Sequence, residues 1–65
     1  MKQLLKTTDK KAVESFLDQL YYQAACDTGN TRALIRHYYV KGAGEYEEVA
    51  QVSYNFNTEV YIIRM

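Results

Sequence analysis

The first half of the chain carries apolar residues at helical spacing. Five of them recur at intervals of three or four residues and so share one helix face: Val13, Phe16, Leu17, Leu20 and Ala24. Thr8 is a suitable N-cap because its hydroxyl can accept a bond from a free backbone N–H, and Gly29 is a suitable residue to close the helix. The pattern therefore predicts an amphipathic helix from about Asp9 to Asp27.

From Arg32 onward the period changes to two. Tyr, Val, Ile and Phe, which suit a pleated surface, are concentrated in residues 32–41, 45–56 and 59–65. Gly42 suits the first central position of a type II′ turn, and Asn55–Thr58 supplies a second turn. These features predict a three-stranded antiparallel meander. Residues 2–6 could form a short fourth strand before the helix, but five residues are too few to decide whether this strand exists.

The predicted fold class is therefore α+β, with one amphipathic helix packed on a three-stranded or four-stranded antiparallel sheet in a single domain, 1–65. A II′ turn at Gly42-Ala43 would place His37 opposite Glu48. One face would then form the core with Ala33, Ile35, Tyr39, Tyr46, Ala50, Val52 and Tyr54. The other face would be open and would carry Leu34, Arg36, Tyr38, Val40, Glu45, Glu47, Val49, Gln51 and Ser53. A slip of one residue would exchange these faces.

Composition narrows the classes of function. The chain has 65 residues, of which 48% are hydrophobic, and eight basic residues balance eight acidic ones. Zero net charge argues against a protein that depends on phosphate backbones. No apolar run approaches the roughly 18 residues of a membrane span, and a single cysteine is compatible with a reducing compartment. We expect a cytoplasmic protein that does not contact membranes. A chain this short buries little surface alone, so we expect a homodimer.

Residues suited to catalysis are scarce. His37 is the only histidine, and Glu48 could orient its imidazole, although a lone histidine on a strand is usually structural. Cys26 would lie near the C-terminal end of the predicted helix, where the helix dipole disfavours a thiolate. There is no glycine-rich phosphate loop and no metal-ligand motif. We expect a protein that is not an enzyme, with no catalytic residue, metal or cofactor.

The predicted open face is the candidate partner-binding surface. It combines Arg36 and Tyr38 with the acidic residues Glu45 and Glu47, and interfaces favour Tyr and Arg beside apolar neighbours. Residues 1–41 carry seven basic and four acidic groups, whereas residues 42–65 carry one basic and four acidic. An acidic hairpin would suit a basic partner surface. The competing interpretation is a solvated sheet whose charges resist aggregation.

These observations predict a small non-enzymatic protein-binding module. The chain begins at Met1, and we expect a complete small reading frame. Proteins of this kind are frequent among phage and mobile-element products that block a host nucleic-acid enzyme or defence protein, which is a more specific expectation. The alternative is a single-stranded nucleic-acid-binding protein that stacks bases on Tyr38 beside Arg36, although Glu45 and Glu47 would repel the phosphates. A third option is a subunit whose open face serves only self-association.

Overall fold

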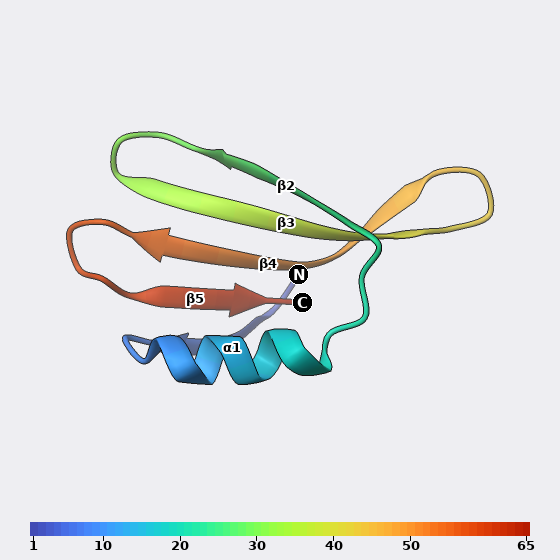
Figure 1. Cartoon of the computed structure of the whole chain (residues 1–65). Coiled ribbons are helices and arrows are strands. Elements are labelled where there is room, and N and C mark those ends of the chain that lie inside the picture. The colour runs from blue at the N-terminus through green and yellow to red at the C-terminus, as the bar shows by residue number, and fades with distance from the viewer.

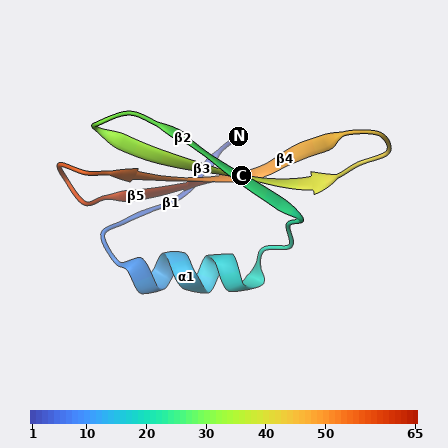
Figure 2. The ribbon, with the colours of Figure 1, turned by 45° about the horizontal axis from the view of Figure 1, so that its top comes forward.

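The computed structural model describes residues 1–65. Its elements follow one another as β1 (Gln3–Thr7), α1 (Lys10–Gln19), β2 (Ala24–Gly29), β3 (Ala33–Lys41), β4 (Tyr46–Asn55) and β5 (Tyr61–Arg64). The strands form one antiparallel sheet in the order β1-β5-β4-β3-β2, with α1 as a second layer beneath one face (Figures 1 and 2). The predicted α+β class is confirmed, but the sheet has five strands rather than three or four.

The helix is shorter than predicted. Asp9, not Thr8, is the N-cap, and its side chain accepts a hydrogen bond from the Lys11 N–H at 2.9 Å. The backbone leaves the helix at Leu20, which is extended. Residues 24–29 then form β2, because pairing with β3 satisfies their backbone groups and outweighs the apolar spacing that continues to Ala24. The predicted helix from Asp9 to Asp27 is therefore wrong beyond Gln19.

The β3–β4 hairpin is closed by a longer loop than predicted. Lys41 pairs with Tyr46, and the Gly42 N–H donates to the Glu45 carbonyl at 2.7 Å across a four-residue connection. Gly42 does not have the positive φ that a II′ turn needs at that position. The predicted two-residue turn is therefore wrong. The second predicted turn is present, and the Asn55 side chain accepts bonds from the N–H groups of Asn57 and Thr58.

A β-bulge decides which side chains of β3 face the helix. Tyr38 pairs with Ala50 but Tyr39 pairs with Glu48, so Val49 is an extra residue on β4. This extra residue reverses the predicted faces of β3 over most of its length. Tyr38 and its even-numbered neighbours face α1, whereas Ile35, His37 and Tyr39 lie on the open face. On β4 the prediction holds in part, because Ala50 and Val52 are in the core.

The core lies between α1 and the middle of the sheet. Five side chains are buried there: Val13, Tyr38, Ala50, Val52 and Ile63. Phe16, Leu17 and Leu20 of the predicted helical stripe pack against them. β1 pairs with β5, which brings the two ends of the chain together. The backbone N–H and carbonyl groups of Lys2 and Met65 form two reciprocal hydrogen bonds there. The only helix is neither long enough nor apolar enough to cross a membrane.

Gly29 generates the first prediction. It ends β2 with a φ of +148°, and a Cβ added there would lie 2.4 Å from the Ala33 carbonyl oxygen. Gly29→Ala should therefore reduce the free energy of unfolding by about 1–3 kcal/mol, measured by urea denaturation. Gly44→Ala is the matched control, because a Cβ at Gly44 meets no atom within 4 Å. Equal stability of the two variants would contradict the role of Gly29.

Candidate functional site

The side of the sheet that α1 covers only in part contains an apolar groove, called here the helix-side groove. It encloses about 360 Å³ between α1 and strands β3, β4 and β5. Ten residues line it: Lys10, Val13, Glu14, Leu17, Leu34, Arg36, Tyr38, Val52, Tyr54 and Tyr61. Seven of them are hydrophobic, and the three charged residues are Lys10, Glu14 and Arg36. This combination of apolar walls and few polar groups is typical of binding sites.

The groove exists because the helix is only ten residues long. The helix packs through Val13 and Leu17 onto the middle strands and leaves Leu34 on β3 37% exposed. At one end of the groove Tyr54 contacts Tyr61 with ring centroids 4.6 Å apart, and it contacts Phe56 at 5.7 Å. Partial burial raises the pKa of the Tyr54 hydroxyl. The molecule is thus a small α+β protein with an exposed aromatic cluster on its sheet.

Tyr38 lies in the floor of the helix-side groove rather than on the open face. Only 3% of it is exposed, and the ring of Tyr22 packs against it edge-on at 4.8 Å. Burial raises the pKa of the Tyr38 hydroxyl, and the neighbouring Arg36 acts in the opposite direction. The predicted placement of Tyr38 on an open face is therefore wrong, and its physical reason is the bulge at Val49.

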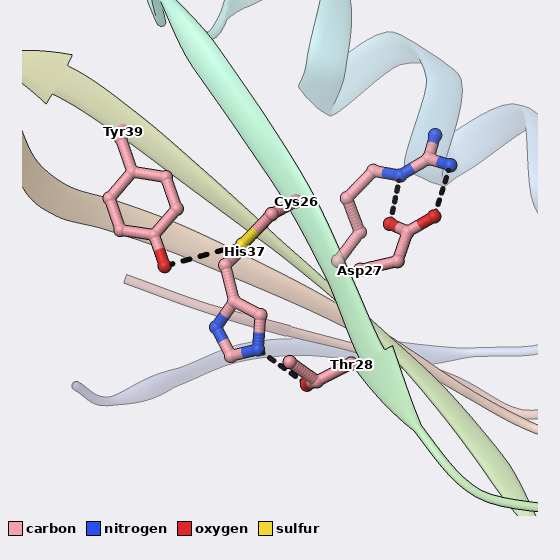
Figure 3. Close-up of polar contacts among 6 residues, drawn as sticks. Cys26, Asp27, Thr28, His37 and Tyr39 are labelled. Carbon is pink, nitrogen blue, oxygen red and sulfur yellow. Dashed lines mark hydrogen bonds and ion pairs between the residues drawn. The ribbon is translucent and has the colours of Figure 1, made fainter.

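Arg36 also faces the helix layer, where it forms a two-pronged ion pair with Asp27 of β2. Its Nε lies 2.6 Å from Asp27 Oδ1 and its Nη2 lies 3.0 Å from Oδ2 (Figure 3). The Asp27 carboxylate raises the pKa of Arg36, and the hydrogen bond from Arg36 lowers the pKa of Asp27. Both side chains are about half exposed, so the pair is a surface contact whose bidentate geometry orients the guanidinium.

The other two predicted binding residues lie elsewhere. Glu45 is in the loop between β3 and β4, and Glu47 pairs with Val40 at the start of β4. Both are exposed. Figures 1 and 2 show this end of the hairpin extending beyond the end of α1. The structure therefore brings Arg36 and Tyr38 together in the groove, whereas neither Glu45 nor Glu47 lines it.

The open face carries a chain of polar contacts across three strands. His37 Nδ1 lies 2.6 Å from Glu48 Oε2, and His37 Nε2 lies 2.7 Å from Thr28 Oγ1 (Figure 3 shows the second contact). The expected contact between His37 and Glu48 is present, but the predicted pairing of these two residues is wrong, because Gln51 lies opposite His37 and Glu48 lies opposite Tyr39. A neutral imidazole protonated on Nδ1 donates to the carboxylate and accepts from the hydroxyl.

This order of hydroxyl, imidazole and carboxylate also occurs where a base activates a nucleophile. Such chemistry needs a substrate pocket beside the hydroxyl. None of the three cavities of the structure has Thr28, His37 or Glu48 in its lining. The contacts form a polar link between β2, β3 and β4.

Cys26 lies on β2 rather than near a helix end, and it is exposed. Its thiol is 3.5 Å from the Tyr39 hydroxyl (Figure 3). This contact, together with partial burial, raises the pKa of Tyr39. No three His, Cys, Asp or Glu side chains are grouped so that they could hold a metal ion.

Sequence reasoning missed Asp27 and Tyr22, because both were included in the predicted helix. A weak signal for the strand was available: Gly29 and Asn30 precede Arg32 as turn residues would precede a paired strand. The Asn30 side chain accepts bonds from the N–H groups of Arg32 and Ala33, which forms the turn between β2 and β3.

Comparisons with known proteins return no matching family model, no matching curated protein and no matching solved structure.

The Asp27–Arg36 pair generates the second prediction. Because the pKa of Asp27 is lowered in the folded state, the pair adds stability above the ordinary aspartate pKa of about 3.9 and loses it as the pH falls through the folded pKa. Asp27→Asn should therefore be slightly less stable than wild type near pH 7 and equally stable in strong acid. Urea midpoints from pH 7 to pH 2, with a carboxyl NMR titration, measure this.

Asp18→Asn is the control, because Asp18 of α1 forms no ion pair. A loss of stability of Asp27→Asn that persists unchanged in acid would show that the effect does not come from the ionised carboxylate.

Proposed function

We propose that this chain is a non-enzymatic protein-binding module that accepts apolar side chains of a partner in the helix-side groove. The observation that carries the proposal is the groove itself, with an aromatic and aliphatic lining left open beside a short helix. At about 360 Å³ it is at the small end of the roughly 300–1,000 Å³ range of ligand sites. A site of this size suits one anchoring side chain, such as those that dominate binding at protein interfaces.

The charged groups of the groove support a peptide-like partner. Lys10 and Glu14 project from α1 and lie across from Arg36, whose guanidinium is oriented by Asp27. A partner that places an apolar residue between these charges can also donate to Glu14 and accept from Lys10. The apolar contact would supply affinity, and the charges would supply orientation.

Glu45 and Glu47 serve a different purpose in this proposal. They lie at the exposed end of the β3–β4 hairpin, where a negative potential would attract a basic partner before the groove is filled. An inhibitor that blocks a host nucleic-acid enzyme or defence protein is the specific form of the proposal, because nucleic-acid-binding surfaces are basic.

Binding of single-stranded nucleic acid is the other class of function. The ring of Tyr38 is buried, so it offers no open face on which a base could stack. The protein-binding proposal therefore has the stronger geometric support, and the experiment below distinguishes the two.

Leu34 provides the test of the groove. It lines the groove and is 37% exposed, so Leu34→Glu should fold while placing a charge where a partner's apolar side chain would bind. We expect affinity for the partner to fall at least about tenfold. Partners would be captured from nuclease-treated and untreated lysate of the source or its host. The purified partner would then be titrated by calorimetry.

Leu4→Glu is the matched control, because Leu4 lies on β1, is 56% exposed and does not line the groove. Circular dichroism would confirm that both variants fold. Equal affinity of wild type and Leu34→Glu would refute the groove, and material lost on nuclease treatment would favour nucleic-acid binding instead.

A second measurement tests the acidic hairpin. Replacing Glu45 and Glu47 by Gln should slow association with the partner identified above and flatten the dependence of the association rate on salt, because exposed charges act mainly on encounter. The dissociation rate should change little. Stopped-flow or surface-based kinetics between low and high salt measure both rates, and an unchanged association rate would remove the steering role.

A further inference from the structure

The free edge of β2 offers unpaired backbone groups. β2 is the last strand of the sheet, and its pairing with β3 ends at the Asn30 N–H, which donates to the Ala33 carbonyl at 2.9 Å. Hydrogen-bonded pairs alternate along an antiparallel ladder. The backbone groups of Ala25, Asp27 and Gly29 therefore point away from β3, toward the outside of the sheet (β2 is the uppermost strand in Figure 1).

This edge lacks the features that usually prevent strand addition. Natural edge strands are protected by Lys, Pro or bulges. The opposite edge strand, β1, has Lys6, is preceded by Lys2 and has a register shift at Leu4. β2 has no Lys, Pro or bulge, and the carboxylate of its only charged residue, Asp27, is held by Arg36. The β2 edge is therefore less protected than the β1 edge against pairing with a strand of another chain.

The exposed area supports a second copy as the occupant. A monomer of 7.6 kDa is expected to expose about 4,300 Å², whereas this chain exposes 4762 Å². The difference of about 460 Å² is more than half of the roughly 800 Å² that each partner buries in an interface of standard size. A surplus of this size is expected for a subunit that buries part of its surface against another copy.

Charge selects the register. A symmetric antiparallel pair that overlaps five of the six β2 residues has two possible centres, Cys26 (pairing 24–28) and Asp27 (pairing 25–29), whereas a centre at Thr28 pairs only residues 27–29. Centring on Asp27 would place two carboxylates directly opposite each other, which destabilises a strand pair. Centring on Cys26 places Ala25 opposite the partner's Asp27 and avoids the repulsion. We propose that two copies of this chain join β2 to β2 in antiparallel orientation, with Cys26 opposite the partner's Cys26, to form one continuous ten-stranded sheet.

This dimer also extends the helix-side groove. A cavity of about 270 Å³ at the β2 edge shares Arg36 and Tyr38 with the groove and includes Tyr22, Ala25 and Asp27 in its lining. In the monomer this cavity ends at the sheet edge. In the dimer the partner's β2 continues its floor, so the two grooves face each other across the two-fold axis. The pairing of the edges does not depend on what the groove binds.

The test measures mass in solution. Light scattering and sedimentation from about 5 to 500 µM should give twice the 7.6 kDa of the chain. Ala25→Pro removes an outward N–H without breaking the ladder to β3, and it should weaken the dimer at least about tenfold. Ala25→Asp should have the same effect, because it faces the partner's Asp27, whereas Ala25→Lys should retain the dimer.

Leu4→Asp on β1 is the matched control and should leave the dimer intact. Circular dichroism reports folding of each variant, and the Ala25→Asp and Ala25→Lys pair decides the outcome if Ala25→Pro does not fold. A monomer across the concentration range, or a dimer that the folded Ala25 variants do not alter, overturns the proposal. Equal dissociation by Asp and Lys at position 25 overturns the register.

Cys26 gives an independent readout. In the proposed register the two Cα atoms form a non-hydrogen-bonded pair about 4.5 Å apart, within the range that a disulfide spans. Diamide, which takes up the two thiol hydrogens, should therefore link two copies at Cys26 with the fold retained. Ala25→Asp should slow this reaction at least about tenfold, in line with its effect on the dimer. Equal rates of Cys26 disulfide formation in the wild type and in Ala25→Asp would overturn the proposed register.

Discussion

One extra residue in the pairing of β3 with β4 governs the arrangement of the side chains described above. The bulge at Val49 lies between the Tyr38–Ala50 and Tyr39–Glu48 pairs and reverses the faces of β3 relative to an uninterrupted ladder. It brings Tyr38 into the core beside Val13 and turns His37 to the open face. Both the helix-side groove and the polar link between three strands depend on this reversal. The bulge thus decides on which face of the sheet these side chains lie, without changing the order of the strands.

The second constraint is the small amount of apolar material that covers the sheet. One ten-residue helix lies beneath five strands, and only five side chains are buried. A domain of this size has little stability to spare, because burial only just exceeds the entropy lost on folding. The uncovered part of the helix-side face is where the groove forms, and the unprotected edge of β2 borders it. The proposed binding of a partner and the proposed pairing of two copies are therefore two ways to bury the same kind of surface.

The candidate site was only partly predictable. Arg36 and Tyr38 were identified from their residue types and are neighbours in the groove, but on the opposite face from the one expected. Their partners Asp27 and Tyr22 were missed, because residues 20–27 have apolar spacing compatible with a helix and become extended only through contact with β3. The predicted two-residue turn would have placed Glu45 and Glu47 on the same sheet face as Arg36 and Tyr38. The observed four-residue connection changes this register, so that Glu47 lies opposite Val40 and neither glutamate lines the groove.

Local pattern by itself determined the class of fold, the helix around Val13 and Phe16, the strands that became β3, β4 and β5, and the turn at Asn55. Each follows from interactions between residues close in the chain, namely side-chain periodicity, capping and turn geometry. Tertiary structure decided the end of the helix at Gln19, the existence of β2 and the face on which Tyr38 lies. These depend on hydrogen bonds between residues far apart in the sequence. Because the side-chain period of a strand is two, a single inserted residue reverses a face, and no local pattern near Tyr38 indicates the bulge at Val49.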